Sequence, residues 1–450
     1  MRQIQARQQS LFCQSSNHRF SQELAAASHI LDQHPDFNRW VYDDLSGGKS
    51  KIDTGVRGMT AEQVLRAAVI KQQNGWSYDF LEVQCVDSEM TRAFLRLDFC
   101  ESYSASCLQE NISKIRPTTW EKITRSLVQY AHREGIENGR MVRCDSTVVE
   151  ANIHHPTDSK LLYDCVRVVH RALKVLRRDS GMRIYSKMTA KSAKHLVLKI
   201  VNCHDEKQRR RLYRKLLGGA KSVLHSLSSS LPKIKAHLAS DDTRIVAAIA
   251  ELERIASILP RIIHQTVERV MEGKAIPSPE KIVSIFETHT DIIVKGRRDV
   301  EYGHKIFLTT GQSNLVLDCL IEDGNPSDKI LFVPLIKDQI GIFGRSPRQI
   351  SADGGFASKE NITGAKDLGV KDVCFSKRCG LKIRDMVKSE WVFQKLRNFR
   401  AGIEASISVL KRTFGLTRAN WRGKRGFLAY VKSCIVAYNL TILARLKLAN

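Results

Sequence analysis

The stretch Arg400-Ala401-Gly402-Ile403-Glu404-Ala405-Ser406-Ile407-Ser408-Val409-Leu410-Lys411-Arg412 predicts a helix that packs into a core and carries charge along one side. Its apolar residues recur at helical spacing and fall on one face, namely Ile403, Ile407 and Leu410. Arg400, Glu404 and Lys411 follow one another at spacings of four and seven, so they share one flank of the helix. One carboxylate therefore lies among cations on this helix, and its role depends on which other residues of the chain lie near it.

Glu404 is the only acidic residue between Glu390 and the C-terminus. Residues 371–432 hold sixteen Lys and Arg against four Asp and Glu. A carboxylate in such surroundings is either a solvated ion-pair partner or a metal ligand whose neighbouring cations hold phosphates. Further carboxylates at the ends of predicted strands would favour the interpretation of Glu404 as a metal ligand.

Two aspartates fit that requirement. Residues 139–150 are rich in β-branched side chains around Asp145, which predicts a buried strand, and a buried carboxylate is costly unless it is paired or binds a metal. Residues 349–356 predict a short strand that ends at Asp353 and two glycines, although a simple turn aspartate is the alternative there. Three converging carboxylates repel one another unless cations neutralise them, and their hard oxygen atoms suit Mg²⁺ or Mn²⁺. We therefore expect Asp145, Asp353 and Glu404 to hold two such ions.

The predicted elements alternate between strands and helices around these residues. After the first strand and an insertion, we expect short strands at 282–287 and 291–295, a hairpin at 305–322, and alternating helices and strands up to a long helix at 388–412. This order resembles a ribonuclease-H-like core, which is a mixed sheet with flanking helices. We predict such an α/β catalytic domain over residues 137–450, interrupted by a basic helical insertion at about 158–278.

The chain before this domain divides into two parts. Residues 1–55 are polar and mixed in character, and we expect an N-terminal arm there. Residues 56–136 show apolar helical periodicity and predict an all-helical domain. A DNA-binding domain and a scaffold or dimerisation bundle are both compatible with that pattern.

The net charge of +25 and the pI near 9.7 indicate a polyanionic partner, with nucleic acid as the first candidate. The excess is concentrated in residues 165–225, which hold seventeen Lys and Arg against three Asp and Glu, including Arg209, Arg210 and Arg211. A solvated helical face is the alternative. Because so much charge of one sign repels itself without a polyanion, we favour DNA binding by the insertion.

The remaining composition favours a soluble cytoplasmic protein. None of the eleven cysteines forms a Cys-x-x-Cys pair, which favours free thiols in a reducing compartment. No secretory signal pattern begins the chain. The best apolar run, residues 434–446, is too short for a membrane span and contains Asn439 and Arg445, so we expect a packed terminal helix and no membrane contact.

Four motifs occur in an order that resembles one known family. They are Cys144-Asp145-Ser146-Thr147, Tyr302-Gly303-His304-Lys305, Ala352-Asp353-Gly354-Gly355 and Arg400-x3-Glu404-x6-Lys411. Together they look like the DDE transposases of bacterial insertion sequences, and in particular the subgroup with a Tyr-x2-Arg-x3-Glu-x6-Lys signature. Arg397 stands where that subgroup has its tyrosine, and Trp421-Arg422-Gly423 resembles the family's segment after the signature helix.

The resemblance implies an enzyme with a ribonuclease-H-like catalytic domain that binds terminal inverted repeats and catalyses metal-dependent DNA cleavage and strand transfer. It implies that Asp145, Asp353 and Glu404 are the catalytic metal ligands, and that double-stranded DNA, both element ends and target, is the substrate of a homo-oligomer. Its DNA contacts would come from basic side chains, namely Lys305, Arg400, Lys411, Arg412 and Arg422. Two alternatives stay open, a ribonuclease-H-like nuclease that cuts without joining and an inactive transposase-derived DNA-binding protein.

Overall fold

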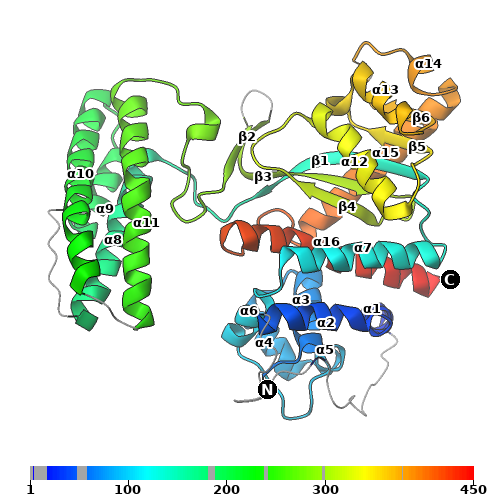
Figure 1. Ribbon diagram of the computed structural model, residues 1–450, viewed down its shortest axis with the longest axis horizontal. Helices are drawn as coiled ribbons and strands as arrows, with labels where there is room; N and C mark the ends of the chain where they lie inside the picture. Colours follow the sequence, from blue (N-terminus) through cyan, green and yellow to red (C-terminus); the bar gives the residue numbers. More distant parts are fainter. Residues whose placement is uncertain are drawn as a thin grey trace. The chain divides into compact units, whose positions relative to one another are not determined.

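The computed structural model describes residue 4 and residues 18–47, 58–180, 188–237, 242–295, 299–377 and 379–449 (Figure 1). The chain divides into two compact units. Unit 1 comprises Met1–Asn152 and Ile293–Asn450, and unit 2 comprises Ile153–Ile292. Each unit has its own hydrophobic core.

Unit 1 is built on a mixed sheet that has six strands within the described ranges. The strand order is β2-β3-β1-β5-β6, and β4 also pairs with β3. The strands are β1 (Met141–Glu150), β2 (Asp291–Lys295), β3 (Asp299–Thr310), β4 (Val316–Ile321), β5 (Gln349–Ala352) and β6 (Asp372–Phe375). β1 runs antiparallel to β3 and parallel to β5, and β5 runs parallel to β6.

The register of β1 and β5 places two of the candidate residues side by side. Cys144 lies opposite Ala352 in this parallel pair. Asp145 and Asp353 are the next residues along, so they lie side by side where the pairing of the two strands ends, with Asp145 in the middle of β1 and Asp353 directly after β5. The buried apolar residues of β1 and β5 hold this register, because a slip by one residue would turn each side chain to the other face.

Helices cover both faces of the sheet. α15 (Glu390–Arg412) contacts the face on which Arg143 and Asp145 lie, and α12 (Asp328–Phe343) contacts the face of Ser146. α13 (Lys359–Asp367) packs on α12, and two short helices complete this region, namely η3 (Gly354–Phe356) and α14 (Ile383–Met386). α15 begins at that cap, where the Ser389 hydroxyl accepts a hydrogen bond from the backbone N–H of Val392.

The helices that precede the sheet belong to the same unit. They are α1 (Arg19–Asp32), α2 (Pro35–Ser46), α3 (Ala61–Asn74), α4 (Tyr78–Asp87), α5 (Glu89–Leu95), α6 (Ala105–Ile112) and α7 (Pro117–Arg133). α1, α3 and α7 pack directly on the C-terminal helix α16 (Gly423–Ala449), as Figure 1 shows for α7. The segment 1–55 therefore differs from the expected arm, since its described part holds two helices whose apolar faces are buried in the core.

α16 is longer than the apolar run that the sequence suggested. Among the described residues it is the one helix that is long and apolar enough to cross a membrane by length and composition, and most of that apolar window is buried inside the protein. Polar side chains fix it in place. Asn439 bonds the backbone N–H and C=O of Val316, and Arg445 pairs with Glu23 at 2.9 Å. α16 thus packs as the core helix of unit 1.

Unit 2 is a bundle of helices around a separate apolar core. Its elements are α8 (Asp158–Ser180), α9 (Ala190–Val201), α10 (Glu206–His237), α11 (Thr243–Thr266), the π-helical turn η1 (Val267–Met271) and the 3₁₀ turn η2 (Ser278–Glu280). Asp158, at the start of α8, accepts hydrogen bonds from Gln265 and Arg269. These bonds join the first helix of the bundle to the end of α11 and to η1. The unit extends beyond the expected insertion of about 158–278.

One predicted strand is wrong. Residues 282–287 form no strand, whereas β2 occupies the expected range Asp291–Lys295. Ile282 and Ile285 are instead buried in the core of unit 2. A short apolar run is compatible with a strand and with a packed loop, and here it forms a loop that packs into the core of unit 2.

A buried lysine at the α3–α16 contact gives a test of this packing. Lys71 is 2% exposed, its ammonium lies 4.6 Å from the centre of the Tyr78 ring, and burial lowers its pKa to about 8. Because the unfolded pKa is near 10.5, charging this amine destabilises the fold fully below pH 8, and the penalty disappears as pH rises through the window of about 8 to 10.5. We predict that Lys71→Met raises the free energy of unfolding at pH 7 by about 1–3 kcal/mol.

Urea denaturation at pH 7 and at pH 10.5 checks this prediction. The advantage of Lys71→Met should shrink at the higher pH, and the matched change at exposed Lys122 should shift stability by less than about 0.5 kcal/mol at either pH. A Lys71→Met variant that is less stable at pH 7 would contradict it.

Candidate active site

Three carboxylates from three separate elements meet at one guanidinium. Arg400 lies on α15, and its Nη2 atom is 3.0 Å from Asp145 Oδ2 and 3.6 Å from Asp353 Oδ1. Its Nη1 atom is 2.7 Å from Glu404 Oε1, one turn along the same helix. The middle of β1, the end of β5 and the flank of α15 therefore bring together the three acidic residues that the sequence suggested.

The solvent exposure of the four charged side chains increases from the interior of the site to the surface. The side chains of Asp145 and Arg400 are 14% and 15% exposed, that of Asp353 is 39% exposed and that of Glu404 is 60% exposed. Water and a surface ligand can reach the outer two carboxylates. The inner pair joins the sheet to the helix, since Asp145 lies on β1 and Arg400 on α15.

Burial and the partner cation act in opposite directions on Asp145. Burial raises the pKa of this carboxyl above its ordinary value, and the nearby Arg400 guanidinium and the backbone N–H of Ser146 only partly offset that effect. The neighbouring Asp353 carboxylate adds to the rise. Asp145 in its ionised form thus depends on a nearby positive charge.

Asp353 is held in the ionised form by hydrogen bonds. Burial alone would raise its pKa, but the hydroxyl of Ser376 donates to Asp353 Oδ1 at 2.7 Å, and the Gly354 backbone N–H and Arg400 also favour the charged carboxylate. The net effect is a pKa below the ordinary value. Ser376 follows β6, the next parallel strand, so the sheet itself supplies this donor.

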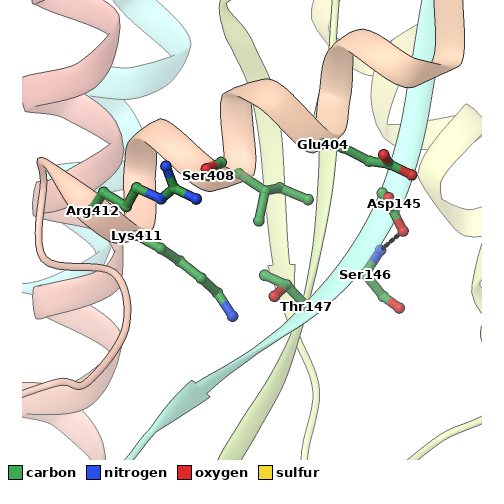
Figure 2. Close-up of a pocket in the computed structure, with 8 residues that line it drawn as sticks. Asp145, Ser146, Thr147, Glu404, Ser408, Lys411 and Arg412 are labelled. Carbon is green, nitrogen blue, oxygen red and sulfur yellow. Dashed lines mark hydrogen bonds between the residues drawn. The ribbon is translucent and has the colours of Figure 1, made fainter.

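A pocket of about 400 Å³ opens beside the carboxylates (Figure 2). In Figure 2 Glu404 extends toward Asp145, and Lys411 reaches from α15 toward Thr147. The pocket therefore has an acidic end and a basic end on one helix. It is lined by Asp145, Ser146, Thr147, Glu404, Ile407, Ser408, Lys411 and Arg412.

Other predicted DNA contacts lie elsewhere. Lys305 is opposite Val148 in the β1–β3 register, which places it on the sheet face away from Asp145, where it pairs with Asp328. Arg422 is exposed in the turn before α16 and is not among the residues that line the pocket. Arg209, Arg210 and Arg211 are exposed on α10 of unit 2, and Arg210 pairs with Glu206.

Sequence reasoning missed the residue that positions α15. Arg143 lies two residues before Asp145 on β1 and is 4% exposed. Its Nη1 atom donates to the carbonyl of Phe399 at 2.7 Å, its Nε atom donates to Thr310 at 2.8 Å, and its guanidinium stacks over the Phe399 ring. The signal was a basic residue at an inward position of a buried strand. Arg143 thus fixes the helix turn that carries Arg400.

The donor set fits a hard divalent cation in its chemistry. All three groups are carboxylates, and all three already contact one cationic group. Among the described residues, no group of three or more His, Cys, Asp and Glu side chains has the spacing of a metal site. The Arg400 guanidinium contacts all three carboxylates.

With this geometry in hand, comparison with known proteins gives one positive result. Residues 286–440 match the family model of the transposase DDE domain. The match supports a DDE transposase. No curated protein and no solved structure matches the chain.

The matched segment contains two of the three carboxylates. Asp353 and Glu404 lie inside residues 286–440, and Asp145 lies far upstream of them. The parallel pairing of β1 with β5 and the ion pair with Arg400 bring Asp145 to the other two. The structure therefore joins to the matched domain a strand that the family match does not cover.

The Arg143 contact gives a second prediction. A side chain at Gly402 would place its Cβ atom 1.9 Å from Arg143 Nη1, so Arg143→Met and Gly402→Ala both break the same contact. We expect Arg143→Met to lower the free energy of unfolding by about 2–4 kcal/mol. The substitution removes the buried donor that now bonds the Thr310 hydroxyl and the side-chain oxygen of Asn314. The double variant should lose less than the sum of the single losses.

Chemical denaturation of the four proteins in this cycle measures the coupling. The matched variant Arg140→Met changes an exposed arginine just before β1 and should stay within about 0.5 kcal/mol of the wild type. Strict additivity of the two changes would show that they do not act on a shared contact.

Proposed function

We propose that this protein is the DDE transposase of an insertion sequence, which binds terminal inverted repeats and catalyses metal-dependent DNA cleavage and strand transfer. The observation that carries the proposal is the convergence of Asp145, Asp353 and Glu404 on one cation, from two adjacent strands and one helix. The match of residues 286–440 to the transposase DDE domain supports it independently.

The catalytic domain is proposed to be ribonuclease-H-like. β1 and β3 pair antiparallel, β1, β5 and β6 pair parallel, and α15 crosses the parallel strands. Asp145 lies on the first strand, Asp353 directly after β5 and Glu404 on the last helix before α16, which is the arrangement that such a core requires. The helical unit 2 enters between β1 and β2.

Asp145, Asp353 and Glu404 are proposed to hold Mg²⁺ or Mn²⁺, with two ions expected. Such ions, when bound, activate a water or a DNA 3′-hydroxyl and stabilise the leaving oxygen at phosphorus. The protein's own contribution is positional. Ser376 and the Gly354 N–H keep Asp353 ionised. Arg143 holds α15 through the Phe399 carbonyl, in the position where Glu404 faces Asp145.

The DNA backbone is proposed to enter at the basic end of the pocket. Lys411 and Arg412 follow Glu404 on α15 and line the same pocket as the carboxylates, so a phosphate held by them would lie beside the reacting centre. This spacing also fits the subgroup signature that ends in lysine. At the tyrosine position of that signature, Arg397 is exposed on α15. Cytoplasmic, nucleoid-associated action on double-stranded DNA by a homo-oligomer follows from the same proposal.

Two other readings make different predictions. A ribonuclease-H-like nuclease would cut the DNA and never join it, so pre-cut element ends supplied with target DNA distinguish it from a transposase. An inactive transposase-derived DNA-binding protein would bind without any metal-dependent product. The clustering of all three carboxylates favours an enzyme over this last reading.

The main test removes one carboxylate at a time. We expect Asp145→Asn, Asp353→Asn and Glu404→Gln each to lower cleavage and joining of a duplex bearing the element's own ends by more than about 100-fold, with no loss of DNA affinity in EDTA. The assay compares Mg²⁺ with EDTA and follows cleaved and joined products on denaturing gels.

The matched control is Asp323→Asn, which removes an exposed carboxylate that pairs with Lys424. It should keep activity within about threefold of the wild type, as expected for a surface ion pair. DNA binding without cleavage or joining of any substrate, in any metal ion, would overturn the proposal.

Unit 2 is proposed to bind the DNA backbone through α10. Lys207 and Arg211 are exposed and one helical turn apart, so they share a flank of this helix. We expect the double variant Lys207→Glu/Arg211→Glu to weaken binding to duplexes of any sequence, and to reduce the slope of log Kd against log salt by about two.

Fluorescence anisotropy over a salt series measures both effects. Arg244→Glu reverses an exposed charge at the start of α11, in the same unit, and should leave the slope within about 0.5 of the wild-type value. An unchanged slope in the α10 variant would assign the phosphate contacts to other residues.

A further inference from the structure

Arg400 stands where a metal ion would have to bind. One guanidinium contacts the side-chain oxygens of Asp145, Asp353 and Glu404 at 3.0, 3.6 and 2.7 Å. Those contacts use the oxygen atoms that a divalent cation would need. A metal and this guanidinium would also repel each other at such short range. Both cannot hold all three carboxylates at the same time.

The same arginine has an unused donor. Its Nε atom is buried and has no hydrogen-bond acceptor, although its two Nη atoms are engaged. A guanidinium has five N–H donors in a planar fork, which match the oxygens of a phosphate better than those of three dispersed carboxylates. The present contacts therefore satisfy Arg400 only in part.

A phosphate acceptor is available close by if the proposed function holds. Lys411 and Arg412 lie on the same helix and line the pocket shared with Asp145 and Glu404. Arg400 does not line this pocket, but it pairs with Glu404, which does, from one turn away on α15. A DNA phosphate bound at the Glu404 end of the pocket would offer Arg400 a charged partner.

We infer that Arg400 competes with the divalent cation for the three carboxylates, and that a DNA phosphate draws it away, so that DNA and metal bind cooperatively. Without DNA, the arginine neutralises the acidic cluster and keeps metal affinity low. With DNA bound, the carboxylates lose their cation and accept the metal. By thermodynamic linkage, the metal must strengthen DNA binding by the same factor. The inference rests on the proposed metal site, and it assigns to Arg400 a coupling role beyond contact with DNA.

The test measures Mn²⁺ binding to the full chain, with and without a short DNA duplex, by titration calorimetry and by the electron paramagnetic resonance signal of free Mn²⁺. For the wild type we expect the duplex to tighten Mn²⁺ binding by about tenfold or more. For Arg400→Gln we expect tight Mn²⁺ binding without DNA, and less than about a twofold gain on adding the duplex. Neither readout requires catalysis.

Arg400→Gln separates the inference from a simpler cause of coupling. If a DNA phosphate tightened Mn²⁺ binding only by ligating the ion, the gain would persist in Arg400→Gln. If the arginine only supported the fold, the variant would bind Mn²⁺ no more tightly than the wild type does. Either result would overturn the inference. The matched variant Arg397→Gln, at an exposed position one turn earlier on α15, should behave as the wild type.

Two further variants complete the design. Arg400→Lys keeps one positive charge but cannot span three carboxylates, so Mn²⁺ affinity without DNA should lie between those of the wild type and Arg400→Gln. If Arg400→Gln does not fold, Arg400→Lys becomes the deciding variant. A Mn²⁺ affinity without DNA no higher than that of the wild type would then overturn the inference. Glu404→Gln should weaken Mn²⁺ binding in every condition. Unchanged binding in that variant would instead refute the metal site, and with it the proposed function.

Discussion

Electrostatic repulsion among three carboxylates is the constraint on which this structure depends. Asp145, Asp353 and Glu404 lie close enough to share one guanidinium, and such a cluster is stable only beside a positive charge. The sheet fixes two members through the parallel register of β1 and β5, and Arg143 fixes the helix that carries the third. Arg400 supplies the neutralising charge in the state described here.

This arrangement explains why so basic a chain keeps a compact acidic centre. The net charge of +25 favours contact with a polyanion, and the exposed cations of α10 and the basic end of the pocket give it defined places to act. Positive charge at the pocket is proposed to hold phosphates near the carboxylates without requiring sequence recognition. Binding and chemistry are thus proposed to meet on α15, which carries Arg400, Glu404, Lys411 and Arg412 within four turns.

Sequence reasoning reached the acidic residues because each follows a local rule: a carboxylate within an apolar strand, one directly after a strand, or one alone on a helix flank. It could not give side-chain direction where register decides it, so Lys305 was placed with the site although it faces α12. It also read residues 1–55 as an arm, since short amphipathic helices gain their stability from packing on α16. Arg143 escaped notice because its role depends on a contact 256 residues away.

The measurement that tests the central claim most directly is anomalous diffraction from crystals of the protein grown with Mn²⁺ and DNA. The account predicts anomalous density about 2 Å from the carboxylate oxygens of Asp145 and Asp353, with the Arg400 side chain turned away from them. Density at another acidic cluster, or none beside these carboxylates at saturating Mn²⁺, would contradict the claim that they form the metal centre of a DNA-cleaving enzyme.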